Sequence, residues 1–268
     1  MNDALLLSAI EPFAQAASAT ARLTVRGVSR SFGKVRALDD VSFSVHECEF
    51  VAVLGPSGSG KTTLFKCMTG LMASDRGSVH VGGLDVSALR GRARRHIAVV
   101  FQQFNLVARL SALANVLAGR LGHVAQWRGW VRTFSRADLL LAYECLDRVG
   151  LLAQAQQRAD TLSGGQQQRV AIARALAQRP DIIVADEPIA SLDPGISAGI
   201  LDLMRGICRS ERVSVVCSLH QVHFARQYAD RIVGLANGRV ALDVATRQFD
   251  EGAASILYGS VAPAQAGA

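Results

Sequence analysis

The chain has 268 residues, of which 50% are hydrophobic and 19% are charged. This composition excludes disorder over most of the length, because disordered chains carry too few hydrophobic residues to form a core. No apolar run in the sequence reaches the ~20 residues that a membrane-spanning helix needs. The net charge of +7 is compatible with anionic lipid headgroups or nucleic acid as partners and does not choose between them.

The cysteines indicate the redox compartment, and a cluster of arginines marks the most basic part of the surface. The five cysteines are scattered without metal-ligand or disulfide spacing, which predicts small buried thiols in a reducing compartment. The densest basic patch is a run of four arginines, for which a solvated face is favoured over a headgroup, acidic-partner or nucleic-acid contact. These arginines are Arg90, Arg92, Arg94 and Arg95.

The first half of the chain alternates strands and helices. Residues 1–21 are expected to form an N-terminal extension, partly helical or disordered, rather than a signal peptide. Strands are predicted at 22–28, 41–45, 50–54 and 97–101, and a hairpin at 79–86. The continuous apolar run 50–54 is typical of a buried parallel strand, and it leads into a glycine-rich loop and a helix over 61–69.

The second half begins with a helical pattern, which predicts an inserted helical subdomain over about 105–160. Strands follow at 182–185 and 213–218, and a hairpin joins 232–235 to 240–243. Residues 246–268 are poorly patterned and are expected to form a C-terminal tail. Alternating strands and helices predict an α/β fold with a mainly parallel core sheet, occupying 22–245 as one domain.

A phosphate-binding loop is predicted between the strand at 50–54 and the helix that follows it. The sequence Gly-Pro-Ser-Gly-Ser-Gly-Lys-Thr matches the P-loop pattern in the strand–loop–helix context that the pattern requires. Its glycines let backbone N–H groups form an anion nest, Lys61 adds a charge for the β- and γ-phosphates, and Thr62 offers a hydroxyl to Mg²⁺. The residues expected to contact ATP here are Gly55, Pro56, Ser57, Gly58, Ser59, Gly60, Lys61, Thr62 and Thr63.

Two adjacent acids end the apolar strand at 182–185. Carboxylates at the end of a buried strand are unfavourable unless they meet a cation or hydrogen-bond donors. Beside a P-loop, Asp186 is expected to help hold Mg²⁺ and Glu187 to polarise the attacking water. The two motifs together predict a nucleotidase of the P-loop type without saying which kind.

A second anion-binding helix start is predicted about 100 residues after the first. Ser163 is a favourable N-cap, and Gly164 and Gly165 expose backbone N–H groups at the start of the helical run that ends near Gln178. With Leu162 and Gln166 these residues spell Leu-Ser-Gly-Gly-Gln.

On these motifs the chain resembles the ABC ATPase family from about residue 22 to residue 243. The Leu-Ser-Gly-Gly-Gln run is similar to the family's signature motif, and residues 191–194 are similar to its D-loop, which includes Asp193. Phe32 occupies the place of an adenine-stacking aromatic, although a core aromatic is an alternative. Gln102 matches the Q-loop glutamine better than its neighbour Gln103 does, and His220 matches the switch histidine.

The resemblance implies a composite ATP site. It places the signature motif against the γ-phosphate held by an opposite subunit, so one P-loop and one signature motif per chain imply a head-to-tail homodimer with two ATP molecules between the subunits. Catalytic roles are implied for Glu187, His220 and Gln102, and Mg²⁺ ligation for Thr62, Gln102 and Asp186.

Other features indicate the kind of ABC protein. Residues 62–162 hold no heptad run and no cysteine cluster, and the chain has one ATPase domain, which argues against the nucleic-acid-acting members. The absence of a fused membrane domain favours an importer subunit on the cytoplasmic face of the inner membrane, docked on separate permease chains and acting indirectly with a periplasmic solute-binding protein.

The transported substrate is indicated only by resemblance to one group within the family. Residues 101–110, 115–122, 127–128, 186–194 and 218–222, with Phe134, are similar to the phosphonate importer ATPases. Glu211 and Arg212 depart from that family, which has a Gly turn there. ATPases for polar amino acids share many of these motifs, and phosphate or phosphite importers are further alternatives.

Overall fold

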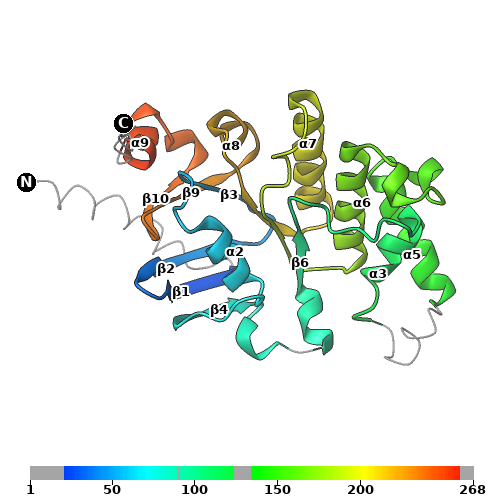
Figure 1. Cartoon of the computed structure of the whole chain (residues 1–268), viewed down its shortest axis with the longest axis horizontal. Helices are drawn as coiled ribbons and strands as arrows, with labels where there is room; N and C mark the ends of the chain where they lie inside the picture. Colours follow the sequence, from blue (N-terminus) through cyan, green and yellow to red (C-terminus); the bar gives the residue numbers. More distant parts are fainter. Residues whose placement is uncertain (1–20, 90, 124–133, 260–268) are drawn as a thin grey trace, which may run out of the picture.

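The computed structural model describes residues 21–89, 91–123 and 134–259 (Figure 1). Its strands are β1 (Ala21–Phe32), β2 (Val35–His46), β3 (Phe50–Leu54), β4 (Arg76–Val81), β5 (Leu84–Asp85), β6 (Ile97–Val100), β7 (Ile182–Ala185), β8 (Ser214–Ser218), β9 (Arg231–Ala236) and β10 (Arg239–Ala245). Its α-helices are α2 (Lys61–Met68), α3 (Ala112–Ala118), α5 (Arg136–Arg148), α6 (Gly164–Ala177), α7 (Pro194–Ser210), α8 (Val222–Tyr228) and α9 (Glu251–Tyr258). Short 3₁₀ helices cover Val86–Ala88, Gly91–His96, Leu152–Gln154, Ala159–Thr161 and Thr246–Gln248.

The core sheet has the order β10-β9-β3-β8-β7-β6. All its pairings are parallel except that of β10 with β9, so the predicted mainly parallel sheet is confirmed. Every residue of β3 is buried, and successive side chains point to opposite faces. Phe50 and Leu54 join the core that includes residues of α3, α5, α6, α7 and α8, and Val51 and Val53 join a second core on the other face.

The second core lies between the main sheet and an antiparallel sheet of order β2-β1-β4-β5. Helix α2 contributes Leu64, Phe65 and Met68 to this core, and Figure 1 shows it beside β1 and β2. Strand β1 extends beyond the predicted end at residue 28, because its pairing with β2 continues to the pair Phe32 and Val35. The strand that leads into the glycine-rich loop is thus supported on both faces.

The helical subdomain consists of α3, α5 and α6 with the short 3₁₀ helices near 152–161, and it lies at the far side of the sheet from β1 and β2 (Figure 1). Helix α5 begins at a capping box in which Ser135 Oγ accepts from the Asp138 N–H and Asp138 accepts from the Ser135 N–H. The segment before α3 is fixed by Asn115, whose side chain is buried and bonds to both the N–H and the carbonyl of Val107.

The chain after β10 folds into more structure than its weak pattern predicts. Helix α9 begins at Asp250, whose carboxylate accepts from the Ala253 N–H. Leu257 of α9 is fully buried, and its side chain lies so close to Gly234 of β9 that a Cβ there would lie 2.4 Å from it. Residues 1–20, Arg90, the side chain of Arg92, residues 124–133, which include Trp127, and residues 260–268 of the predicted C-terminal tail lie outside the described residues. None of the described helices is both long and apolar enough to cross a bilayer.

Candidate functional site

The loop after β3 takes a backbone path that only glycine accommodates at two points. Gly58 has φ +79° and Gly60 has φ +101°, both in the left-handed region. A Cβ on Gly60 would also lie 2.4 Å from the carbonyl oxygen of Ala37 in β2, so a side chain there would collide with the neighbouring sheet. Helix α2 then starts at Lys61 without a side-chain cap, which leaves its first N–H groups for an external acceptor.

Lys61 is a buried ammonium group bonded to neutral atoms. Its Nζ donates to the carbonyl oxygens of Gly55, at 2.8 Å, and Pro56, at 3.0 Å. Among the residues that the structure describes, it forms no ion pair within 4.0 Å. Burial lowers the pKa of Lys61, and the more distant charges of Glu187 and Asp186 oppose that shift. A bound anion would stabilise this charge, so the loop suits a phosphate group.

The side chains of Glu187 and His220 contact each other across the cavity from Lys61. Glu187 follows β7 with φ +49°, a strained conformation of the kind found at functional sites. His220 follows β8, and its Nε2 lies 2.5 Å from Glu187 Oε1. The parallel pairing of β7 and β8 brings their C-terminal ends together, and with them these two side chains.

Ser218, the last residue of β8, connects the two acids. Its hydroxyl accepts a hydrogen bond from the Glu187 N–H at 2.7 Å and donates to Asp186 Oδ1 at 2.9 Å. Burial raises the pKa of Asp186, because the charged form loses solvation that this one hydroxyl only partly replaces. Ser218 was not among the predicted site residues, although a polar residue at the end of an otherwise apolar strand was a signal that could have identified it.

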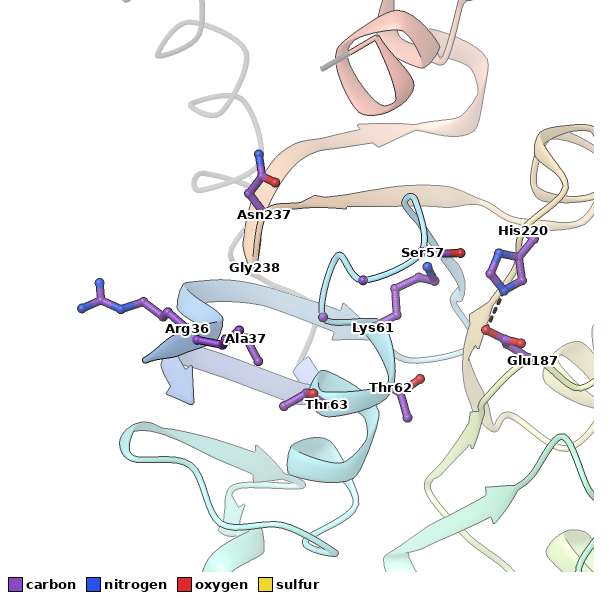
Figure 2. Close-up of a pocket in the computed structure, with 13 residues that line it drawn as sticks. Arg36, Ala37, Ser57, Lys61, Thr62, Thr63, Glu187, His220, Asn237 and Gly238 are labelled. Atoms are coloured by element: carbon purple, nitrogen blue, oxygen red, sulfur yellow. Dashed lines mark hydrogen bonds and ion pairs between the residues drawn. The ribbon is translucent and has the colours of Figure 1, made fainter. Parts of the chain in front are cut away.

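A cavity of about 550 Å³ lies between these elements, within the range of ligand sites. Figure 2 shows Ser57, Lys61 and Thr62 on one side of it and Glu187 and His220 on the other. The remaining wall comes from the start of β2 and the β9–β10 turn, neither of which was predicted to belong to the site. These lining residues are Val35, Arg36, Ala37, Asn237 and Gly238.

The β9–β10 turn reaches the cavity through backbone hydrogen bonds. The Gly238 N–H donates to the carbonyl oxygen of Ser59 at 3.1 Å, and the Gly238 carbonyl accepts from the Asp39 N–H at 2.8 Å. The turn thus connects the P-loop to β2. The sequence predicted this turn, but the parallel pairing of β9 with β3 is what brings it beside the loop.

Several predicted site residues do not line the cavity. Phe32 is 45% exposed at the end of β1, where the Arg30 guanidinium lies 5.2 Å from the centre of its ring. Gln102 is exposed after β6, and Asp193 is exposed at the N-cap of α7. The residues of the Leu-Ser-Gly-Gly-Gln motif are likewise absent from the cavity lining.

That motif forms the capped start of α6. Ser163 Oγ accepts from the Gln166 N–H at 3.4 Å, and Gln166 Oε1 accepts from the Ser163 N–H at 3.0 Å. Both Ser163 and Gly164 are exposed. The predicted helix start is confirmed, and it presents its free N–H groups to the outside of the chain rather than to its own P-loop.

Comparison with known proteins extends the resemblance over most of the chain. The ABC transporter family profile matches residues 38–190. The phosphonates import ATP-binding protein PhnC of Frankia casuarinae is 52% identical over 237 residues, which cover 87% of this chain and 94% of the relative. The hypophosphite import ATP-binding protein HtxD of Stutzerimonas stutzeri is 48% identical over 240 residues, which cover 88% of this chain and 70% of the relative.

Solved structures show the same fold. A dimeric ATP-binding cassette in a post-hydrolysis state with ADP and Pi superposes with a TM-score of 0.72 at 35% identity, over 85% of this chain and 100% of that chain. The ADP conformation of an ATP-binding cassette of an ABC transporter gives a TM-score of 0.77 at 26% identity, over 88% of this chain and 98% of that chain. The family inferred from short motifs is therefore confirmed across both sheets and the helical subdomain.

Proposed function

The chain belongs to the ABC transporter family, and from this premise we propose that it is the ATP-hydrolysing subunit of an importer for phosphonates. The observation that carries the proposal is the cavity in which the buried Lys61 ammonium faces the Glu187–His220 pair. A buried cation opposite a carboxylate is the arrangement that phosphate binding and water activation both require.

On this proposal the P-loop residues from Gly55 to Thr63 hold the phosphates of ATP, with Lys61 at the β- and γ-phosphates. Phe32 stacks on adenine near the edge of the cavity formed by Val35, its partner across the β1–β2 turn. His220 contacts the γ-phosphate. Ser163, Gly164, Gly165, Gln166 and Asp193 act on the ATP held by a second copy of the chain.

The residues Thr62, Gln102 and Asp186 would hold Mg²⁺, which neutralises phosphate charge when it is bound. The half-buried Asp186 carboxylate fits this role. Burial raises its pKa although it accepts a hydrogen bond from Ser218, so a cation beside it would stabilise its charged form. Glu187 accepts a proton from the attacking water as the oxygen of that water bonds to the γ-phosphorus. The bond from the γ-phosphorus to the bridging oxygen breaks, and ADP and phosphate leave.

The exposed start of α6 supports a composite site. One chain provides one P-loop and one such start, and the latter does not line its own cavity. We therefore infer a head-to-tail homodimer that closes on ATP and opens after hydrolysis. It would dock on permease subunits at the cytoplasmic face of the inner membrane, with a periplasmic solute-binding protein acting through the permease and with no nucleic-acid partner.

The substrate class is supported by the relatives named for phosphonate and hypophosphite import. The decisive experiment reconstitutes this chain with its permease in liposomes that enclose ATP and Mg²⁺ and adds the binding protein with one solute at a time. We expect an alkylphosphonate to stimulate ATP hydrolysis. Stimulation by hypophosphite or phosphite alone would indicate that the substrate is an inorganic phosphorus oxyanion. Stimulation by a polar amino acid alone would contradict the proposed import function.

A further inference from the structure

Arg174 of α6 holds the segment that follows Gln102. Its Nη1 donates to the carbonyl oxygen of Asn105 at 2.6 Å, and its Nη2 donates to that of Phe104 at 2.9 Å. Burial lowers the pKa of this guanidinium, and it forms no ion pair with a carboxylate among the described parts of the chain. The two carbonyl groups are therefore the hydrogen-bond partners that the structure gives to a charge partly removed from water.

The two residues whose carbonyl groups accept hydrogen bonds from Arg174 have unusual backbone dihedral angles. Phe104 has φ +55° and Asn105 has φ +49°, so consecutive non-glycine residues adopt the left-handed region. Such conformations persist only where the surroundings fix them, and they gather at functional sites. The two hydrogen bonds from Arg174 supply that constraint two residues after Gln102.

The same segment also contacts the start of α6. A Cβ added to Gly164 would lie 3.9 Å from Cζ of the Phe104 ring, so this ring lies over the first residue of the helix. The segment after Gln102 thus contacts α6 at two points. The Phe104 ring packs beside Gly164, and the backbone carbonyls of Phe104 and Asn105 accept hydrogen bonds from Arg174.

Helix α6 is itself firmly placed around Arg174. The end of α3 packs directly on its backbone, since a Cβ on Gly119 would lie 2.2 Å from the Arg174 carbonyl oxygen. Arg120 adds a hydrogen bond of 2.9 Å to the carbonyl of Ala177. The guanidinium of Arg174 therefore projects from a rigid part of the helical subdomain.

We propose that Arg174 is a positioning residue of the ATPase, which fixes the segment after Gln102 to α6 so that Gln102 and the Ser163–Gln166 helix start move as one unit. The inference rests on the proposed function, in which Gln102 serves the ATP bound by its own chain and the start of α6 serves the ATP of the partner. Arg174 then links the two ATP sites of the dimer through a single guanidinium.

The test compares Arg174→Lys and Arg174→Met with Arg169→Met. Arg169 is a matched control, because it also lies on α6 and its Nη1 also donates to a backbone carbonyl, that of Val149, at 2.9 Å. All three variants lose a guanidinium–carbonyl contact, and only the Arg174 variants release the segment after Gln102. The full-length chain is assayed for the ATP dependence of hydrolysis and for hydrogen–deuterium exchange at residues 103–106.

We expect Arg174→Met to lower kcat about tenfold while the KM for ATP changes less than about twofold, because the P-loop is untouched and Gln102 is misplaced. Arg174→Lys, which retains a donor for one carbonyl, should lie between Arg174→Met and the wild type. Exchange at residues 103–106 should rise about tenfold in Arg174→Met and stay unchanged in Arg169→Met.

Equal kcat in Arg174→Met and the wild type would overturn the inference, and so would equal effects of Arg174→Met and Arg169→Met. If the wild type itself hydrolyses no ATP, the proposed function fails. The exchange measurement still tests the Arg174 contact in that case, and unchanged exchange at residues 103–106 would overturn it.

Discussion

The Nε2 atom of His220 lies 2.5 Å from Oε1 of Glu187, across two parallel strands that end side by side. Both residues line the cavity that also holds Lys61 (Figure 2). The contact places the proposed water-activating carboxylate next to the proposed γ-phosphate sensor. The arrangement leads to four predictions about individual side chains and one about the assembly.

Replacing Glu187 with Gln should strongly reduce turnover and leave ATP binding intact. The amide retains the shape of the side chain but cannot accept a proton from water, so kcat should fall by about 10²–10⁴-fold. Phosphate release and nucleotide titration on the same sample measure the two properties. Glu211→Gln is the control, because Glu211 pairs with Arg148 away from the cavity and its change should leave turnover unchanged. Near-normal hydrolysis by Glu187→Gln would refute the assigned role.

Replacing Lys61 with Ala should weaken ATP binding itself, because the buried ammonium is the positive charge of the loop that lines the cavity. A charge-assisted contact of this kind is worth about 1.5–3 kcal/mol, so the Kd for ATP should rise at least about tenfold. Lys66→Ala on the same helix removes an exposed charge and serves as the control. Isothermal titration calorimetry that finds equal ATP affinity in both variants would exclude the P-loop role of Lys61.

Replacing Ser218 with Ala should reduce turnover although Ser218 contacts no substrate in the proposed mechanism. The hydroxyl joins the Glu187 backbone to the Asp186 carboxylate, and its loss removes the hydrogen-bond partner of the Glu187 N–H and a donor to the part-buried Asp186 carboxylate. We expect kcat to fall about tenfold. Ser214→Ala is matched to it, since Ser214 lies on the same strand, is equally buried and donates to the His46 carbonyl instead. Equal losses of kcat in both variants would show that only strand stability is involved.

Replacing Asp186 with Asn should make the protein without Mg²⁺ and nucleotide more stable at pH 7. Burial raises the pKa of Asp186 in the folded state, so the folded protein binds this proton more tightly than the unfolded chain does. The contribution of Asp186 to stability is therefore most favourable at low pH and is lost as pH rises from the ordinary aspartate pKa through the folded pKa. Asparagine carries no charge and avoids this loss.

The melting temperature of Asp186→Asn should exceed that of the wild type at pH 7, and the difference should shrink towards pH 4. Asp75→Asn is expected to do the opposite. A hydrogen bond from the Ser31 N–H, aided by Arg30, lowers the pKa of Asp75, so its charged form stabilises the folded state above the ordinary aspartate pKa and this contribution is lost as pH falls through the folded pKa. A lower melting temperature for Asp186→Asn would contradict the inference that burial disfavours the charged form of Asp186.

Much of the fold was predictable because the local signals agree with the final structure. The apolar run at 50–54, the glycine-rich loop after it and the strand 182–185 all appear where expected. Ser163 was predictable as a helix N-cap for the same reason, since a capping interaction involves only neighbouring residues. Periodicity and capping are local properties that a sequence displays directly.

The missed features depend on contacts between distant segments. Ser218 and Glu187, which share a hydrogen bond, are 31 residues apart in the sequence, and Arg174 and Phe104 are 70 residues apart. Helix α9 has a weak pattern because it is short, and Leu257 is buried only because β9 and β10 lie beneath it. Sequence patterns report which face of an element is apolar, and they do not report which distant backbone group a polar side chain will meet.

In the proposed dimer, one chain holds half of each ATP site and a second copy completes it. The most direct measurement is the mass of Glu187→Gln in solution with ATP and Mg²⁺, by light scattering, compared with Glu187→Gln carrying Ser163→Arg or Ser135→Arg. Ser135 caps α5 through the same kind of capping box, so the two arginine substitutions disturb a helix start equally. We predict that ATP doubles the mass of Glu187→Gln and of its Ser135→Arg derivative, while the Ser163→Arg derivative binds ATP and stays a monomer. If ATP-bound Glu187→Gln stays a monomer, or if the dimer tolerates Ser163→Arg as well as Ser135→Arg, then the start of α6 does not complete the ATP site of a second copy.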